Sequence, residues 1–192
     1  QRQKLSLSLR EFQRRLQRED MVKYIHIEDT EETATLGDFL KVAEAHKVFV
    51  NIEPHGYFTT NPDYMARMLA FCDSPYLRMN MDTGNTFIAG QDPAAFLGRF
   101  IDRVNHVHVK DVSESLSAAT RGKQTGIAVS QTAIGDSVNA DNIRSVPGIL
   151  RDRGFDGVLS MECEGQGGLM IDRSLAWLRA TLCELQIPEE KN

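Results

Sequence analysis

The sequence contains few cysteines and no long apolar segment. Its 192 residues include only three cysteines, at the distant positions Cys72, Cys163 and Cys183. This odd, dispersed set argues against a disulfide framework and favours a reducing compartment, so we expect a cytoplasmic protein. No apolar run approaches the roughly 18 residues of a transmembrane helix, and residues 1–20 carry too many charges for a signal peptide. We therefore expect no association with a membrane.

The sequence also lacks an excess of positive charge. Its formal net charge is −5, whereas proteins that neutralise the phosphates of a duplex usually present a basic face. The charge argues against nucleic acid as a partner. None of the apolar segments described below is followed by a glycine-rich phosphate loop, which excludes the usual dinucleotide-binding architecture.

Short apolar segments alternate with amphipathic ones along the chain. The apolar segments predict five strands, at residues 22–27, 48–53, 76–81, 105–109 and 158–162. Helical spacing of apolar residues predicts helices at residues 8–19, 35–47, 62–73, 93–103, 140–153 and 172–185. Pro147 and Gly148 should kink the helix at 140–153. The polar segment 113–131 predicts a long loop that covers the functional site or is mobile.

Strands that alternate with helices pair in parallel, in either a doubly wound sheet or a closed barrel. Four consecutive strands end in a carboxylate or an imidazole, at Glu53, Asp82, His106 with His108, and Glu162. A (β/α) barrel of TIM type gathers its chemistry at this end of its strands, so we assign the chain to the α/β class and to that barrel. A whole barrel has eight strands and about 250 residues. We therefore expect residues 1–192 to form a single, partial barrel domain that lacks about the first three β/α units. The sequence has no initiator Met, so we expect a fragment, a processed chain or missing upstream residues.

The polar strand ends suit a metal ion. Carboxylate oxygens and an imidazole nitrogen form a hard donor set for Mn²⁺, Mg²⁺, Co²⁺ or Zn²⁺. Structural roles stay open for the same residues: Glu53 as a loop acid bonded to backbone donors, and Asp82 as the first residue of an Asx-turn. We expect His106 and His108 to face opposite sides of their strand, and Glu164 to be a loop residue. A metal site explains these positions together, whereas structural roles need a separate reason for each.

Five segments carry a family resemblance. They read IEPHGYF at residues 52–58, MNMDTGN at 79–85, NHVHVKD at 105–111, AIGDSVNADNI at 133–143 and GFDGVLSMECEG at 154–165. In this order they resemble the xylose isomerase-like TIM-barrel superfamily. That superfamily includes sugar phosphate isomerases and epimerases, D-tagatose 3-epimerase-like enzymes, hydroxypyruvate isomerases and endonuclease IV.

The resemblance implies a set of site residues. A divalent ion, with Mn²⁺ the first choice and Mg²⁺, Co²⁺ or Zn²⁺ the alternatives, is then held by Glu53, Asp82, His108 and Glu162. The second His of the His-x-His motif is the ligand in relatives, which leaves His106 a structural role. In ketose 3-epimerases the two ligand glutamates also form an acid/base pair on opposite faces of the substrate. Glu53 and Glu162 inherit those catalytic roles by resemblance.

The sequence departs from the epimerase pattern at two positions. Asn85 stands where the epimerases have a His three residues after the ligand Asp, and Lys110 follows the His-x-His motif where they place an Arg shortly afterwards. The EPH version of the first motif instead resembles the barrel subunits of C-glycoside deglycosidases. In those subunits a His two residues after the ligand Glu is a candidate base, which is His55 here. A rim residue hydrogen-bonded to the next loop is the structural alternative for this histidine.

By this resemblance the chain is a divalent-metal-dependent sugar isomerase or epimerase. It is expected to withdraw a proton next to a carbonyl and to pass through a metal-bound enediolate. Two alternatives stay open: a lyase or C-glycoside deglycosidase-type subunit acting on 3-oxo-sugars, and an endonuclease IV-like phosphodiesterase. The expected partner is a small sugar or sugar-derived substrate, together with a second copy of the chain or a partner subunit that completes the barrel.

Overall fold

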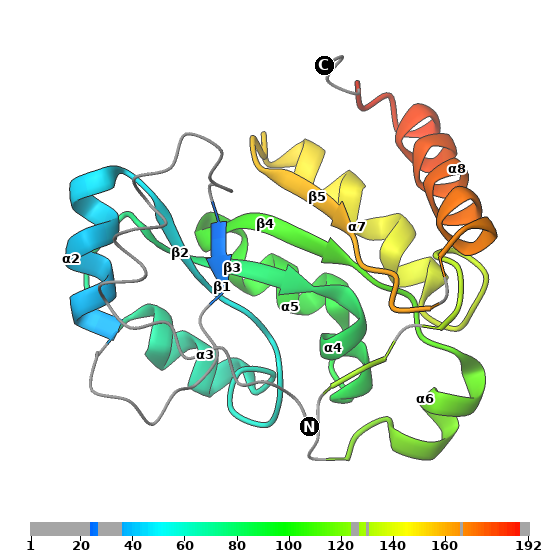
Figure 1. Ribbon diagram of the computed structural model, residues 1–192, viewed down its shortest axis with the longest axis horizontal. Coiled ribbons are helices and arrows are strands. Elements are labelled where there is room, and N and C mark those ends of the chain that lie inside the picture. The colour runs from blue at the N-terminus through cyan, green and yellow to red at the C-terminus, as the bar shows by residue number, and fades with distance from the viewer. Residues whose placement is uncertain (1–23, 27–35, 124–126, 130, 166, 189–192) are drawn as a thin grey trace.

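The computed structural model describes residues 24–26, 36–123, 127–129, 131–165 and 167–188. Its sheet has five strands, paired in chain order: β1 (Tyr24–His26), β2 (Phe49–Ile52), β3 (Leu77–Asp82), β4 (Val104–Val109) and β5 (Val158–Met161). Every neighbouring pair is parallel (Figure 1), which confirms the predicted alternation and pairing. The helix predicted at residues 8–19 lies outside the described residues.

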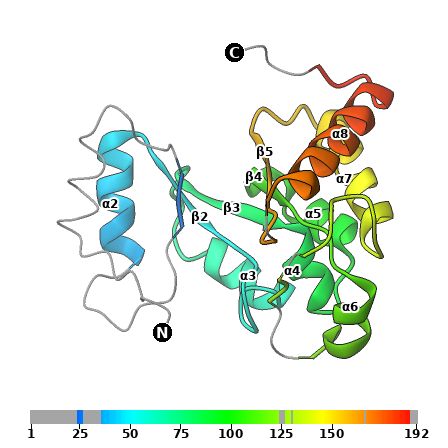
Figure 2. The same ribbon diagram turned by 45° about the vertical axis from the view of Figure 1, so that its right-hand side comes forward.

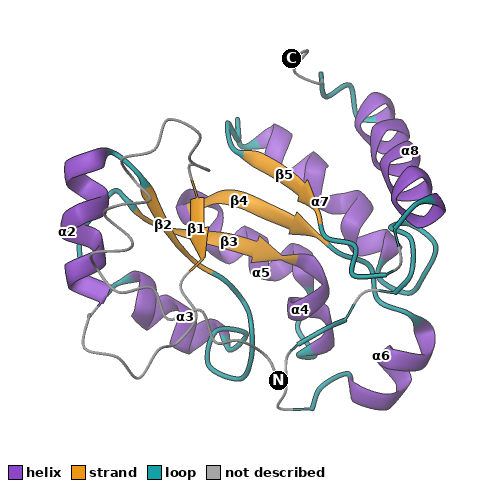
Figure 3. Ribbon diagram, in the orientation of Figure 1, coloured by secondary structure: helices purple, strands orange, loops and turns teal. Residues whose placement is uncertain are grey.

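Helices follow the strands along the chain. They are α2 (Leu36–His46), α3 (Pro62–Leu69), α4 (Thr83–Ile88), α5 (Pro93–Phe100), the 3₁₀ turn η1 (Ile101–Arg103), α6 (Glu114–Thr120), α7 (Ala140–Asp152) and α8 (Leu169–Glu184). α3, α5 and α7 lie on one side of the sheet, whereas α6 lies beyond the end of the strands (Figure 3). The rotated view in Figure 2 shows α2 beside β1 and β2, at the opposite end of the sheet from α7 and α8.

Two helices begin with the same local signal. Asn61 precedes Pro62 and Asp92 precedes Pro93, so that each helix has a proline in its first turn. The side-chain oxygen of Asn61 accepts from the amides of residues 63 and 64, and that of Asp92 accepts from residues 94 and 95. Because a proline carries no N–H, it costs no hydrogen bond at this position. This capping is why the sequence predicted both starts correctly.

The two faces of the sheet differ in polarity. Met79 and Met81 of β3, with Val107 and Val109 of β4, pack in the main core against apolar residues of α5 and α7. A smaller core joins α2 to β2 and β3. Residues on the alternate positions of the same strands are polar, and they point to the other face because side chains in a strand alternate with a period of two. The helices therefore bury the apolar face, and the polar face is left to form a site.

The observed elements correct the predictions in several places. Residues 83–88 form the short helix α4, where no helix was predicted, and residues 114–120 of the predicted loop form α6. α8 begins at Leu169, three residues before the predicted start. α7 continues through Pro147 without interruption, and the kink predicted at that residue stays a prediction. Within the described residues, no helix has the length and apolar character needed to cross a membrane.

Candidate metal centre

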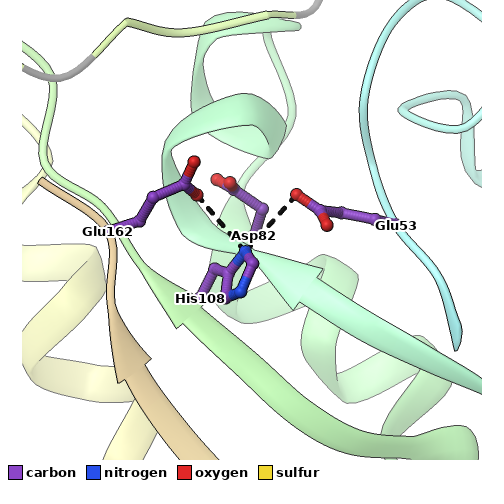
Figure 4. A group of neighbouring side chains, drawn as sticks. All are labelled: Glu53, Asp82, His108 and Glu162. Carbon is purple, nitrogen blue, oxygen red and sulfur yellow. Dashed lines mark ion pairs between the residues drawn. The ribbon is translucent and has the colours of Figure 1, made fainter. Parts of the chain in front are cut away.

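Four side chains from four neighbouring strands converge at the carboxyl end of the sheet. Each offers one donor atom, and these atoms all lie within 4.8 Å of one another: Glu53, Asp82, His108 and Glu162. Glu53 and Glu162 directly follow β2 and β5, whereas Asp82 and His108 belong to β3 and β4. The parallel register aligns Asp82 with His108, which brings them to the same level of the sheet. Figure 4 shows the four side chains pointing toward a common centre.

The imidazole of His108 lies between two carboxylates. Its Nδ1 atom is 3.4 Å from Glu53 Oε1 and 3.3 Å from Glu162 Oε2, and Figure 4 shows the two carboxylates on opposite sides of the ring. Asn80 lies beneath this group: its side-chain amide donates to Glu53 Oε2 at 2.9 Å and is 3.1 Å from His108 Nδ1. Asn80 was not singled out in the sequence, although it stands two residues before Asp82 and so shares its face.

Asp82 has two roles at once. Its Oδ1 accepts from the backbone amide of Asn85 at 2.7 Å and thereby caps α4, while the carboxylate also belongs to the converging group. The capping role of Asp82 therefore does not exclude a role as a metal ligand, because the same carboxylate also lies in the converging group. Asn85 adds a side-chain hydrogen bond to Asp82 Oδ2 at 3.1 Å, and its own Oδ1 accepts from the amide of Ala128. Asn85 thus fixes Asp82 and is fully buried.

Lys110 is buried beside the carboxylates. Its Nζ atom is 3.3 Å from Asp82 Oδ2 and 3.0 Å from Glu162 Oε1, and its side chain is 2% exposed. A lysine at this depth is unusual, because an ammonium that leaves water must be compensated by charge and hydrogen bonds. Lys110 follows the His-x-His motif, shortly after which the ketose 3-epimerases have an arginine. Nothing in the sequence indicated that this lysine would be buried.

Burial and charge shift the ionisation of the group strongly. Complete burial raises the pKa of Asp82 well above its usual range, the Lys110 ammonium opposes this rise, and the carboxylates of Glu162 and Glu53 add to it. For Lys110 itself, burial lowers the pKa, but the charges of Asp82 and Glu162 outweigh burial and raise it. The negative charge of the site therefore exceeds what its one buried ammonium neutralises.

The pKa values of His108 and of its partner Glu162 shift in opposite directions. Burial lowers the pKa of His108, but hydrogen bonds to Glu162 and Glu53 outweigh burial and raise it to about 10. Burial raises the pKa of Glu162, but hydrogen bonds from His108 and Asp82, with the charge of Lys110, lower it to about 2. Without a metal ion, the proton on His108 supplies positive charge at the centre of the group.

The donor set fits a divalent cation. Three carboxylates and one imidazole within 4.8 Å of one another are the hard oxygen and nitrogen ligands that such ions prefer. The strong attraction that His108 shows for a proton has the same origin, because a cation at this position relieves the repulsion among the carboxylates. The geometry is thus compatible with a divalent ion and does not select one metal.

His55 and His106, the other two histidines considered for the site, occupy different environments. His55 is exposed, and its backbone amide donates to the Thr59 hydroxyl at 2.6 Å, which fixes the turn that follows β2. The prediction that His106 and His108 face opposite sides is wrong: residues two apart in a strand share a face, and the two ring centroids are 4.9 Å apart. His106 Nε2 is 2.7 Å from the Ser160 hydroxyl, so this ring bridges β4 and β5 below the site.

Asp111 and Asn139 attach the loop before α7 to the ends of β3 and β4. The buried carboxylate of Asp111 accepts from four backbone amides, those of Val112, Gly135, Ser137 and Asn139. The side-chain amide of Asn139 donates to the carbonyls of Thr83 and Lys110. These bonds hold the chain segments around residues 83, 110 and 135–139 together in the fold. Neither residue was identified as structural from the sequence.

The sequence matches one protein family and resembles curated enzymes. A protein-family model described as xylose isomerase-like TIM barrel matches residues 31–181. Inosose dehydratase from Clostridium tetani is 26% identical over 101 residues, which are 51% of this chain and 34% of that protein. The chain thus spans about a third of the length of this curated relative.

Two solved structures share the fold. A xylose isomerase domain protein from Planctomyces limnophilus aligns with a TM-score of 0.62 and 21% identity, over 85% of this chain and 58% of its own. The 3-keto-D-glucoside 4-epimerase from E. coli aligns with a TM-score of 0.56 and 15% identity, over 90% of this chain and 70% of its own. At these identities the similarity shows a common fold.

Proposed function

Since the chain belongs to the xylose isomerase-like TIM-barrel family, we propose that it withdraws a proton next to a ketone on a sugar-like polyol. The observation that carries this proposal is the convergence of four donor side chains, one from each of four strand ends, within 4.8 Å. Glu53, Asp82, His108 and Glu162 would hold a divalent ion, with Mn²⁺ the first choice. Such an ion, when bound, polarises a carbonyl oxygen and makes the neighbouring C–H bond more acidic.

We propose His55 as the base that takes this proton. His55 is exposed and stands two residues beyond Glu53 in the chain, and imidazole is the side chain best matched to proton transfer near neutral pH. Glu162 is a weaker base, because its pKa is lowered to about 2 by hydrogen bonds and charge that outweigh its burial. The glutamates form the alternative acid/base pair, since Glu53 and Glu162 lie on opposite sides of His108 (Figure 4).

Loss of water is the outcome that the curated relatives support best. Removal of the α-proton gives an enediolate, and departure of a hydroxyl group from the next carbon, with a proton, yields an unsaturated ketone and water. Inosose dehydratases are the relatives that match this chain by sequence, so we propose a keto-cyclitol or similar keto-polyol as substrate. Reprotonation of the same enediolate would instead give isomerisation or epimerisation.

Deuterium incorporation tests the proposal directly. The Mn²⁺-loaded protein is incubated with a keto-inositol in D₂O, and mass spectrometry follows both deuterium gain and loss of water. We expect deuterium gain above the rate with free Mn²⁺, and its loss in Asp82→Ala. Asp152→Ala is the matched control, because it removes a carboxylate whose side chain is 66% exposed. Deuterium gain without water loss would identify an isomerase or epimerase, and the absence of both from metal-loaded protein would refute the proposal.

A further inference from the structure

The ammonium of Lys110 has a fixed set of partners. Besides the carboxylate oxygens of Asp82 and Glu162, its Nζ atom donates to the carbonyl of Ala128 at 3.2 Å and lies 3.7 Å from Glu164 Oε2. Ala128 is 1% exposed, so this contact is buried like the ammonium itself. The Lys110 ammonium therefore has one carbonyl and the carboxylates as partners within the protein, and its side chain is only 2% exposed to solvent.

The fold holds the stem of Lys110 as firmly as its charge. The hydroxyl of Thr83 donates to the carbonyl of Lys110 and accepts from its amide, both at 2.9 Å. Gly84 leaves the space for the stem: a Cβ atom at this position would lie 2.6 Å from both Cγ and Cδ of Lys110. Burial of an ammonium destabilises a protein unless the charge is paired, and an apolar side chain would fill the space beside Gly84 at lower cost. We therefore expect the charge of Lys110, and not only its volume, to have a role at the site.

The charges of the four ligand side chains balance when the ammonium is counted. Glu53, Asp82 and Glu162 bring three negative charges, of which a divalent ion would neutralise two and Lys110 the third. Glu164 adds a fourth carboxylate 3.7 Å from the ammonium, but its side chain is 35% exposed, so water screens its charge. Withdrawal of a proton from the substrate would add negative charge beside ligands that are already neutralised. Without the ammonium, the same step would add charge beside a ligand set that is already negative, and electrostatic repulsion would oppose it.

We propose that Lys110 is a positioning residue that acts through Asp82 and Glu162, by neutralising the charge of the third carboxylate beside the metal ion. Its effect on proton withdrawal rests on the proposed function, whereas its effect on metal binding does not. An ammonium and a divalent cation repel each other and attract the same carboxylates. Lys110 therefore weakens binding of the ion while it favours the reaction, and its removal has opposite effects on the two.

Lys110→Met separates these effects, because it keeps an unbranched stem beside Gly84 and removes the charge. Titration calorimetry with Mn²⁺ should show binding on the order of tenfold tighter than in wild type. Deuterium gain at saturating Mn²⁺ should fall on the order of tenfold or more. Lys41→Met is the matched control, since Lys41 lies on α2 with its side chain 79% exposed. A merely structural lysine would weaken Mn²⁺ binding when removed, so unchanged or weaker binding overturns the proposal.

Two further measurements keep the test decisive. Lys110→Gln retains a donor for the Ala128 carbonyl without the charge and should show the same tightening of Mn²⁺ binding, in case the methionine variant does not fold. In wild type, ¹⁵N-lysine NMR should show a solvent-protected ammonium that persists when Zn²⁺ is bound, and its disappearance on Zn²⁺ binding would refute the proposal. A wild-type protein that binds Mn²⁺ but exchanges no substrate proton refutes the proposed function, and the Mn²⁺ affinities still decide the role of Lys110.

Discussion

Because Gly84 and Lys110 are in close contact, the effect of Gly84→Ala on stability should depend on which residue stands at position 110. In Gly84→Ala the new Cβ would lie 2.6 Å from Cγ and Cδ of the lysine and 2.9 Å from its Cβ, distances at which atoms must move. The stem cannot swing away, because Thr83 binds the backbone of Lys110 and the carboxylates bind its ammonium.

The magnitude follows from two opposing terms. Overpacking a filled site costs about 1–3 kcal/mol, and replacing glycine by alanine within a helix such as α4 returns about 0.5–1 kcal/mol. We therefore expect Gly84→Ala to lower the free energy of unfolding by about 1–2 kcal/mol. In a Lys110→Ala background Cγ and Cδ are gone, and the cost should be at least about 1 kcal/mol smaller.

Lys110→Met provides the control background. Both Lys110 variants remove the ammonium, so the effect of lost charge cancels between them, but the methionine keeps the stem that meets the new Cβ. Urea unfolding in the presence of a chelator, followed by far-UV circular dichroism, gives the free energies if the slopes agree. Gly84→Ala should cost as much beside methionine as beside lysine, and clearly less beside alanine. Equal costs within about 0.5 kcal/mol in all three backgrounds would refute the steric argument.

Three other predictions test the site. Burial lowers the pKa of His108, but its hydrogen bonds to carboxylates outweigh burial and raise it to about 10. A metal ion that binds this imidazole must therefore displace a proton, and its affinity should rise about tenfold per pH unit from neutrality toward pH 10. Calorimetry in buffers of different ionisation enthalpy should detect the released proton, and a flat affinity profile would contradict displacement of a proton from His108. His55→Ala should keep the metal and lower turnover by about 10²–10⁴-fold. Glu53→Ala should lose both turnover and the metal. An unchanged deuterium-exchange rate in His55→Ala would transfer the role of base to Glu162. Asp111→Ala removes the acceptor of four backbone amides, and each such hydrogen bond to a charged group is worth about 1.5–3 kcal/mol. Hydrogen exchange at those four amides should therefore accelerate. Unaltered protection from exchange would contradict the role given to Asp111.

The converging residues were predictable because they depend on simple geometry. Parallel strands end at one edge of a sheet, so the polar residues at the ends of β2 to β5 had to lie near one another once the strands were identified. The choice of His108 rather than His106 came from the family resemblance and not from this geometry. The opposite orientation expected for His106 and His108 was an error of period, since strand side chains repeat every two residues. Correct use of the same rule would have placed Asn80 beneath the site.

Tertiary contacts decide the features that the sequence did not indicate. α4 has six residues, all buried, so its helix depends on its surroundings more than on an apolar stripe. α6 has no buried residue, and for that reason its segment lacks the periodicity that marks a helix. The burial of Lys110 depends on the missing side chain of Gly84 and on the distant carbonyl of Ala128, neither of which leaves a pattern around the lysine itself.

The contacts of Ala128 have a consequence for how this part of the protein can be studied. Its N–H donates to Asn85 and its C=O accepts from Lys110, so both polar groups of residue 128 that reach the site belong to the main chain. Any small residue could supply them equally well. Alanine scanning leaves this position unchanged, and a comparison of sequences would register only a preference for small size. Replacing the amide of residue 128 by an ester, through chemical ligation, removes the N–H alone and makes its contribution measurable.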